Sequence, residues 1–473
     1  MTDLPLGWTT APLRDVADVR LGRQRSPKHE HGDRMRPYLR AANVKWTGLD
    51  LADVKQMAFT ITESKTYELQ AGDLLLGEAS GSPSEVGKPG QYYGQIDGCC
   101  FQNTLLRVRL PEGLSPDFYE HFFREQALNG RFAAGSRGVG IRHLGAAALS
   151  AWQVPIPSSA EQGRIVTAIE EAFSKLDAGE ASLRAARQRL KRMRESVLAA
   201  AVTGCLVPQD PTDTPAAKLL ADLGAESSEN SFNALPNLPT TWVWTPLGSI
   251  ASMSLGKMLD SKTQTGENPH AYVRNINVRW FSFRMNDLAV MDVRPDEVDR
   301  VSVADGDLVV CEGGQPGRCA VWRGPPMVIQ KALHRVRPSP GILSDYLAIV
   351  LSWWAARPDY ERFITGTTIK HIPKEKLRIL PIPLPSSEEQ IGIVAEVERQ
   401  FSFIEACERT VDAAFVRAAA LRRSILKCAF EGHLVPQDRA DEPASALLER
   451  IRNDRAQAAP TANGGRRRAA MGK

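Results

Sequence analysis

The sequence lacks the features of membrane and secreted proteins. None of its 473 residues belongs to an apolar run of about 18 residues, the length that a membrane-spanning helix requires. The N-terminal segment lacks a charged start followed by an apolar stretch. The seven cysteines include no Cys-x-x-Cys spacing, so we interpret them as small hydrophobic residues in a reducing compartment. We therefore expect a cytoplasmic protein with no membrane segment and no metal site.

Motifs that would make the chain an enzyme are also missing. An adenine methyltransferase needs Asn/Asp-Pro-Pro-aromatic, but the only Asn-Pro pair continues as His-Ala (268–271). A P-loop needs four residues between its first glycine and Gly-Lys-Ser/Thr, whereas five separate Gly81 from Gly87. Asp53 with Glu-Ser-Lys at 63–65 matches a nuclease pattern that arises readily by chance, and His-Glu-His at 29–31 lies in a polar stretch typical of a solvated loop. We therefore expect no catalytic residues and no bound cofactor.

The excess of positive charge is small. Lysine and arginine number 59, and aspartate and glutamate 55, which gives a net charge of +4 and a pI near 8.6. This balance permits a polyanionic partner but does not require one. At roughly 100 to 200 residues per unit, the length predicts three or four compact units, and 43% apolar residues are enough for their cores.

One long segment is present twice, at a constant offset of 228 residues (from 154 to 382). Each copy begins with two alternating prolines, continues with a Glu-Gln pair and a long apolar-periodic stretch, and ends with Leu-Val-Pro-Gln-Asp. These features occupy residues 154–157, 161–162 and 206–210 in the first copy and 382–385, 389–390 and 434–438 in the second. The constant offset indicates two copies of one structural unit, so we expect the protein to perform its task twice.

The segments upstream of each copy are related but less alike. Trp8 matches Trp242, and Gly-Asp-Leu at 72–74 matches the same residues at 306–308. The chain therefore alternates between variable and constant segments. We predict a first variable domain at 1–153, a constant helical region with its linker at 154–235, a second variable domain at 236–381, a second constant helical region at 382–452 and a disordered basic tail at 453–473.

The constant segments have the heptad pattern of long helices. Apolar residues recur at every seventh position over roughly 43 residues, which at ~1.5 Å per residue makes a rod of about 65 Å. An isolated rod would leave its apolar stripe in water, so we expect the two rods to pack as an antiparallel coiled coil with a pseudo-two-fold axis. The alternative is that each rod belongs to a separate bundle. Met193 and Leu421 are among the apolar residues between the seam positions. The predicted seam residues are Ile169, Leu176, Leu183, Leu190 and Val197 in the first rod and Val397, Ile404, Val411, Ala418 and Ile425 in the second.

The variable segments have an α+β pattern. Runs such as 73–76 and 307–310 have the length of strands and are bounded by glycine or proline. Loops rich in glycine, serine and proline follow at 77–90 and 313–317, and loops of this kind on a rigid scaffold commonly carry recognition. We predict an α+β protein with two pseudo-symmetric mixed α/β globules separated by two long antiparallel helices.

The order of these motifs resembles the specificity subunit of type I restriction-modification systems (the HsdS family). The resemblance rests on Trp8 with Pro-Leu at 12–13, the Gly-Asp-Leu turns, the segments at 138–144 and 366–372, the Pro-x-Pro start, the Glu-Gln pair and the Leu-Val-Pro-Gln-Asp exit. It extends to about Arg452. Each motif is weak alone, but their order and duplication are specific to this family.

The resemblance implies a non-catalytic, sequence-specific DNA-binding subunit. Each variable domain would be a target recognition domain that reads one half of an asymmetric, bipartite DNA site, and the helices would set the spacer. Two methyltransferase subunits and motor-nuclease subunits would be the partners that methylate adenine and cleave DNA. S-adenosylmethionine, and ATP with magnesium, would bind to those partners. The alternative function is a stand-alone DNA-bridging coiled-coil protein without methyltransferase partners.

The candidate DNA-binding residues are polar residues near strand ends or in glycine-rich loops. Arginine and asparagine are suited to bidentate reading of guanine and adenine, whereas lysine more often contacts phosphate. Ordinary surface or buried polar residues are the alternative interpretation for each of them. The candidates are Arg40, Asn43, Lys45, Gln102, Asn103, Arg137, Arg142 and His143 in the first domain and Arg274, Asn277, Arg279, Gln330, Lys331, Thr367, Thr368, Lys370 and His371 in the second. We expect the residues shared by the two domains to position DNA and the unshared loops to specify its sequence.

Overall fold

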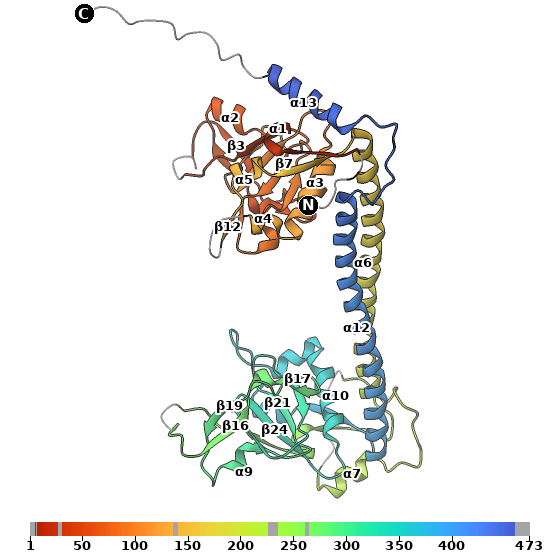
Figure 1. The fold of residues 1–473 in the computed structure, drawn as a ribbon. Helices are drawn as coiled ribbons and strands as arrows, with labels where there is room; N and C mark the ends of the chain where they lie inside the picture. Colours follow the sequence, from red (N-terminus) through yellow and green to blue (C-terminus); the bar gives the residue numbers. More distant parts are fainter. Residues whose placement is uncertain are drawn as a thin grey trace, which may run out of the picture. The chain divides into compact units, whose positions relative to one another are not determined.

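The structure is a computed structural model, and it describes residue 5 and residues 7–26, 31–135, 141–225, 235–260 and 264–458 (Figure 1). The chain divides into two compact units, Met1–Ser182 with Ala414–Lys473, and Leu183–Ala413. The two long helices, α6 (Ser159–Val202) and α12 (Ser387–Phe430), each contribute one part to each unit. Each unit therefore combines one globular domain with parts of both helices. The division into five segments along the sequence stays a prediction.

The domain of the first unit is built on an antiparallel sheet of four strands in the order β2-β11-β7-β9. A smaller sheet of the same domain, β10-β3-β6, contains the parallel pair β10 and β3. The strands are β1 (Thr9–Pro12), β2 (Asp18–Leu21), β3 (Met35–Leu39), β4 (Val44–Lys45), β5 (Gly48–Leu49), β6 (Lys55–Ala58), β7 (Leu74–Gly77), β8 (Ala79–Ser80), β9 (Pro89–Gln91), β10 (Cys100–Phe101), β11 (Leu105–Arg109), β12 (Arg142–His143) and β13 (Gln153–Ile156). The helices are α1 (Leu13–Val16), α2 (Ile61–Tyr67), α3 (Pro116–Leu128), α4 (Arg131–Ala134) and α5 (Ala146–Ser150), with the 3₁₀ turns η2 (Ala41–Asn43) and η3 (Pro83–Glu85).

The domain of the second unit repeats this plan. Its main sheet has the order β15-β24-β21-β22, and β23 runs parallel to β16 as β10 does to β3. The strands are β14 (Val243–Pro246), β15 (Ala251–Leu255), β16 (Pro269–Val273), β17 (Val278–Arg279), β18 (Ser282–Phe283), β19 (Ala289–Asp292), β20 (Ser302–Val303), β21 (Leu308–Cys311), β22 (Cys319–Val321), β23 (Met327–Ile329), β24 (Leu333–Pro338) and β25 (Pro381–Leu384). The helices are α7 (Ala216–Asp222), α8 (Leu247–Ile250), α9 (Val298–Val301), α10 (Ser344–Ala355) and α11 (Lys374–Arg378), with the 3₁₀ turns η6 (Asn275–Asn277) and η7 (Pro358–Phe363).

Each domain packs its apolar helix against the start of one long helix and the end of the other. In the first unit, aromatic residues of α3 share a core with Ile169 of α6 and Leu426 of α12. In the second unit, α10 shares a core with Val197 of α6 and Ile404 of α12. The long helices are thus part of both hydrophobic cores.

Within each unit the long helices run antiparallel. In the second unit, Arg187 pairs with Asp412, and Arg194, further along α6, lies 3.5 Å from Glu408, which is earlier in α12. The first unit contains the equivalent contact, in which Arg422 Nη2 lies 3.3 Å from Glu180. These contacts confirm the predicted α+β class with two globular domains and two long antiparallel helices.

The predicted seam residues are all at least half-buried. Ile169, Val197, Val397, Ile404, Val411 and Ala418 are buried, and Leu176, Leu183, Leu190 and Ile425 are half-buried.

Met193 and Leu421, which the spacing also placed near the seam, are exposed, at 38% and 52%. The neighbouring arginines occupy the contact instead: Arg194 lies 4.4 Å from the ring centre of Phe401, and Arg422 lies 5.2 Å from that of Phe173. An arginine over a phenylalanine ring covers apolar surface and keeps its charge at the edge of the helix pair.

The segment after each long helix packs in the unit where that helix ends. Asp213, which follows α6, accepts a hydrogen bond from Ser386 Oγ at 3.0 Å at the start of α12. Asp441, which follows α12, accepts one from Ser158 Oγ at 2.8 Å at the start of α6. In each copy, the segment that follows the long helix therefore contacts the start of the long helix of the other copy.

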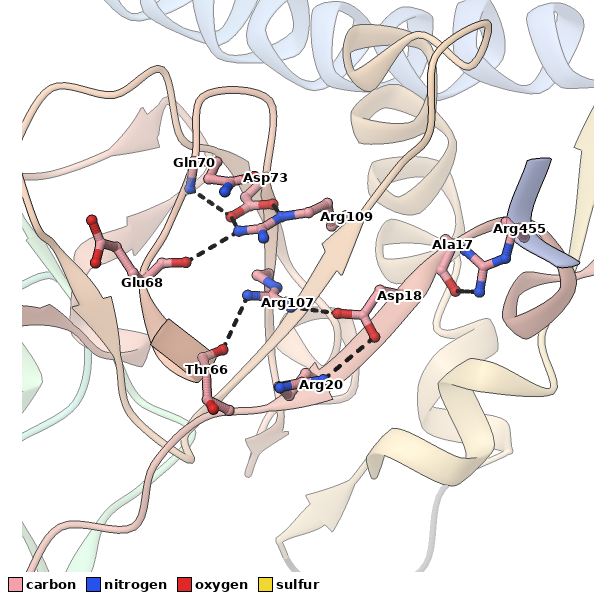
Figure 2. Close-up of polar contacts among 10 residues, drawn as sticks. All are labelled: Ala17, Asp18, Arg20, Thr66, Glu68, Gln70, Asp73, Arg107, Arg109 and Arg455. Atoms are coloured by element: carbon pink, nitrogen blue, oxygen red, sulfur yellow. Dashed lines mark hydrogen bonds and ion pairs between the residues drawn. The ribbon is translucent and has the colours of Figure 1, made fainter. Parts of the chain in front are cut away.

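The C-terminal helix α13 (Ala444–Ala458) lies against α1 of the first domain (Figure 1). Arg455 Nη2 donates to the carbonyl of Ala17 at 3.1 Å, as Figure 2 shows, and Arg452 pairs with Asp15 at 3.0 Å. Because α13 continues to Ala458, the expectation of a disordered tail from residue 453 is wrong for its first six residues; 459–473 lie outside the described residues. In the part of the chain that the structure describes, no helix is long and apolar enough to cross a membrane.

Candidate nucleic-acid interface

A buried Trp–Glu hydrogen bond fixes each domain to the first turn of a long helix. Trp8 Nε1 donates to Glu161 Oε1 at 2.8 Å, and Trp242 Nε1 donates to Glu389 Oε2 at 2.7 Å. Burial raises the pKa of both carboxyl groups, and the indole hydrogen bonds partly offset this effect. In each copy, the repeated tryptophan and the repeated glutamate therefore form one buried contact between the domain and its long helix.

The glutamine of each Glu-Gln pair holds the turn before the main helix of its domain. Gln162 Oε1 accepts from the backbone N–H of Ser115 at 2.7 Å, and Gln390 Oε1 accepts from that of Leu343 at 2.8 Å. Both glutamines are fully buried. Because α3 and α10 begin at these turns, the glutamines also set the position of each domain on its long helix.

The duplicated Gly-Asp-Leu turn is held by a bidentate ion pair (Figure 2). Arg109 donates to both carboxylate oxygens of Asp73 at 2.6 Å, and the N–H of Gln70 donates to Asp73 at 2.8 Å. Arg337 makes the same pair with Asp307, at 2.7 and 2.6 Å. Both aspartates are buried, so the motif stabilises the turn and the end of the central strand.

The candidate Asn43 is a structural residue of the 3₁₀ turn η2. Its Oδ1 accepts from the N–H of Arg40 at 3.0 Å, and its Nδ2 donates to the carbonyls of Asp50 and Asp53 at 2.8 and 3.1 Å. The side chain is 3% exposed. Both edges of the amide are therefore committed to the protein backbone.

Asn277 has the same environment in the second domain. It accepts from the N–H of Arg274 at 2.9 Å and donates to the carbonyls of Arg284 and Asp287 at 3.0 and 2.9 Å. This geometry argues against Asn43 and Asn277 as DNA-binding residues, because a buried amide with no free edge cannot form a bidentate contact with a base.

The arginines before these asparagines are paired as well. Arg40 Nη2 lies 2.6 Å from Asp53, and Arg274 Nη2 lies 2.9 Å from Asp287. The hydrogen bond from Lys55, together with the Arg40 pair, lowers the pKa of Asp53. To read guanine, either arginine would have to leave its aspartate.

The nuclease pattern around Asp53 is also explained by local structure. Glu63 accepts from Arg23 Nε at 2.8 Å and from the N–H of Thr60 at 2.9 Å, as the acid of a capping box at the start of α2. Its carboxylate is therefore occupied. Of the His-Glu-His pattern, residues 29 and 30 lie outside the described residues.

Lys45 and Arg279 lie at equivalent positions and are exposed. They occupy the first strands of the short hairpins β4–β5 and β17–β18. Both remain candidates for contact with phosphate.

The candidates Gln102 and Gln330 mark a close approach of two backbone segments. A Cβ added to Gly22 would lie 2.2 Å from the carbonyl oxygen of Gln102, and one added to Gly256 would lie 2.5 Å from that of Gln330. The duplicated Leu-Gly pair at 21–22 and 255–256 is therefore glycine because no side chain fits there. Both glutamines are half-buried, as is Asn103, whereas Lys331 is exposed.

In the first domain, the candidates Arg142 and His143 lie in β12, paired with β8 of the 77–90 loop. Arg142 Nη1 donates to the carbonyl of Ala133 at 2.8 Å, and His143 Nδ1 lies 3.1 Å from the carboxylate of Glu78. Both side chains thus contact the protein itself. The candidate Arg137 lies outside the described residues.

In the second domain, the equivalent segment forms a tight hairpin. The N–H of Thr365 donates to the carbonyl of His371 at 2.8 Å, and the N–H of His371 donates back at 2.9 Å. Thr367 and Thr368 at its tip are exposed, whereas Lys370 Nζ donates to Glu361 at 2.7 Å. The hydroxyl groups are the free polar groups of this tip.

The second domain brings three predicted segments together. Asn275 Nδ2, in the η6 turn, donates to the carbonyl of Gly313 at 2.8 Å, and Gly313 in turn bridges to His371. Arg318 Nη2 donates to the carbonyl of Asn275 at 2.9 Å, and its Nη1 donates to Gln315 at 3.1 Å. Asn275, Gln315 and Arg318 are absent from the duplicated motifs, because they are not shared between the two copies. We call the segments 274–279, 312–318 and 365–371 the polar face of the second domain; its counterpart is formed by 40–45, 78–88 and 141–144.

Comparison with known proteins places this duplicated architecture in a family. Residues 5–184 match the model of the type I restriction modification DNA specificity domain. The specificity subunit of the type I restriction enzyme EcoKI from Escherichia coli (strain K12) is 26% identical, over 96% of each chain. That of EcoBI from Escherichia coli is 29% identical, over 78% of this chain and 79% of the relative.

The chain belongs to the family of type I restriction-modification specificity subunits.

Solved structures of the family share the fold. A chain from a solved structure described as "Structural basis underlying complex assembly and conformational transition of the type I R-M system" has a TM-score of 0.70 and 18% identity, over 91% of this chain and 99% of that chain. The HsdS subunit from Thermoanaerobacter tengcongensis has a TM-score of 0.55 and 18% identity, over 91% and 98%. Members of this family are non-catalytic subunits that carry no cofactor. Among the described residues of this chain, no group of three or more histidines, cysteines, aspartates and glutamates could hold a metal ion.

Proposed function

We propose that this specificity subunit recognises an asymmetric, bipartite DNA site, with one half-site read by each domain. The observation that carries the proposal is a shared scaffold with unlike loops. The strand order β2-β11-β7-β9 recurs as β15-β24-β21-β22. The segment between β7 and β9 is longer than the one between β21 and β22 and differs in sequence. Similar scaffolds would present these different loops to DNA in the same way.

The polar face of each domain is the proposed site of DNA contact. Among its exposed members, Lys45 in the first domain and Arg279, Thr367 and Thr368 in the second would contact phosphates or base edges. Arg318 and Gln315 are not shared by the first domain, so they are proposed to contribute to specificity. The candidate residues Lys331 and His143 are exposed and would lie at the edge of the contact.

The proposed partners are two methyltransferase subunits and the motor-nuclease subunits of a cytoplasmic restriction complex. The duplication supplies two equivalent sets of helix and domain surfaces, which suits two copies of one partner. The methyltransferases would use S-adenosylmethionine to methylate adenine, and the motor-nuclease subunits would use ATP with magnesium to cleave unmodified DNA. The curated relatives are named as subunits of restriction enzymes, which gives no support to a stand-alone DNA-bridging protein.

Co-purification and methylome mapping test this function. Expressed with its methyltransferase, the chain should form a complex that methylates adenines in one bipartite motif, detected by single-molecule sequencing. Exchange of residues 1–153 for the equivalent domain of a relative should change one half of that motif only. The proposal fails if the isolated chain binds DNA with full affinity and selectivity and recruits no methyltransferase, or if both half-sites change.

The spacer test uses the two long helices. Four residues inserted after Ser182 in α6 and after Ala413 in α12 keep the helices paired and lengthen each by ~6 Å. At ~3.4 Å per base pair, this length corresponds to about two additional base pairs between the half-sites. A methylome with an unchanged spacer would contradict the proposal that the helices set this distance.

A further inference from the structure

Two exposed isoleucines occupy equivalent positions in the two domains. Ile141 is 59% exposed and Ile369 is 74% exposed. Single exposed apolar residues are ordinary on protein surfaces and need no explanation. This pair differs because both copies keep the same apolar residue although the surrounding loops have diverged.

The other exposed apolar side chains of the two domains have no such counterpart. Val290, for example, is 62% exposed, but its equivalent in the first domain is Gln56. Among the exposed large apolar residues in the described part of the chain, the recurrence is otherwise limited to Met193 and Leu421 on the long helices. Within the described residues of the domains, only the isoleucine is retained and exposed in both copies.

The hairpin of the second domain holds Ile369 in a fixed position. Gly366 has a φ of +89°, and a Cβ at this position would lie 2.2 Å from the carbonyl oxygen of Ile369. The side chains of Thr365 and His371 are 2.9 Å apart across the base of the hairpin. The N–H of Ile372 donates to the carbonyl of Glu312 at 2.7 Å, which fixes the hairpin to the 312–318 segment of the same face. The isoleucine therefore projects from a rigid support.

The basic residues beside the isoleucines are already occupied. Lys370 donates to Glu361 at 2.7 Å, and Arg142 donates to the carbonyl of Ala133 at 2.8 Å. Arg142 and Lys370 were among the candidate DNA-binding residues of this duplicated segment. The group that it leaves exposed in both copies is instead the aliphatic side chain.

A residue shared by both domains cannot distinguish two different half-sites, so its task is common to both. If the proposed function holds, each half-site contains one adenine that must leave the base stack for methylation, and each such adenine is paired with thymine. DNA accepts an apolar side chain against a thymine methyl group or between partly unstacked base pairs. The isoleucines belong to the polar faces that are proposed to contact DNA, as exposed apolar side chains among polar ones.

We propose that Ile141 and Ile369 are apolar wedges that pack against DNA beside the target adenine of each half-site and cover the thymine that remains when the adenine is extruded. This inference rests on the proposed function. The wedge lowers the cost of the open base pair, because it replaces stacking that the duplex loses.

The test uses the full complex with its methyltransferase and duplexes in which one half-site is already methylated. Ile369→Ala should slow methyl transfer about tenfold at one half-site and leave the other unchanged, and Ile141→Ala should do the reverse. With 2-aminopurine in place of the target adenine, each variant should reduce the fluorescence increase at its own half-site. Ile369→Leu should retain most of the rate, because an aliphatic side chain of similar volume remains.

Val290→Ala is the matched control, since Val290 is also exposed in the second domain, and it should leave both rates unchanged. The wedge is refuted if neither isoleucine variant slows transfer, if each slows both half-sites equally, or if the methyltransferase no longer co-purifies, which would indicate a docking contact. If the wild-type complex methylates neither half-site, the proposed function itself fails, which separates the two conclusions.

Discussion

Replacement of Asn277 distinguishes a structural residue from one that reads DNA. In Asn277→Ala, three backbone groups lose a hydrogen-bond partner: the N–H of Arg274 and the carbonyls of Arg284 and Asp287. The site is 1% exposed, so water cannot replace the amide without rearrangement of the η6 turn. At about 1 kcal/mol for each bond, we expect a loss of about 3 kcal/mol of unfolding free energy.

The assay is thermal unfolding of the complete chain followed by tryptophan fluorescence. For a unit of about 150–250 residues, a loss of about 3 kcal/mol lowers the melting temperature by roughly 6 to 12 °C. Asn286→Ala is the control, because Asn286 is exposed and its hydrogen bond is with the exposed Arg284 side chain. We expect the control to stay within about 0.5 kcal/mol of the wild type.

The methylome provides the second readout for Asn277→Ala. Below the lowered melting temperature, the variant should methylate the wild-type motif, because the amide does not face DNA. The reasoning is refuted if Asn277→Ala melts at the wild-type temperature while one base of one half-site becomes ambiguous. That result would mean that the asparagine leaves its turn to read adenine.

Three further predictions concern the scaffold. Gly22→Ala should destabilise the first unit by about 3 kcal/mol, because its Cβ would lie 2.2 Å from a backbone carbonyl oxygen. Gly81→Ala, whose Cβ would have nothing within 4 Å, should leave the stability unchanged. Urea unfolding measures both variants, and equal effects would refute the steric argument. Burial raises the pKa of Glu389, so the wild type should lose stability as pH rises from the ordinary carboxyl pKa through the raised one. Between pH 4 and 7, the melting temperature of Glu389→Gln should change less with pH than that of the wild type. Parallel curves for the two proteins would contradict this. Val411→Asp should lower the unfolding free energy by about 3 kcal/mol, because an unpaired charge would enter the helix contact. Val416→Asp, at a position 70% exposed, should be tolerated. Thermal unfolding compares the two variants, and similar losses of stability would argue against the predicted seam.

Much of the candidate site was not predictable from residue types. Arginine and asparagine at 40–43 and 274–277 have the right chemistry for base reading, but the structure commits the asparagines to a turn and pairs the arginines with Asp53 and Asp287. The duplication of these residues reflects a shared fold rather than shared DNA contacts. A residue list cannot separate these cases, because the hydrogen-bond partners are set by the folded turn.

The sequence by itself determined the duplication, the two long helices and the alternation of constant and variable segments. These features follow from repeats and periodicities that are read along the chain, such as the seven-residue spacing of Ile404, Val411 and Ala418. Tertiary structure decided which polar groups are free. Trp8 with Glu161 and Arg337 with Asp307 are far apart in the sequence, and their pairing depends on how the strands and helices pack. For the same reason, only the folded protein shows that Asp213 contacts Ser386 and that Asp441 contacts Ser158. The exposure of Ile369 also became visible only there.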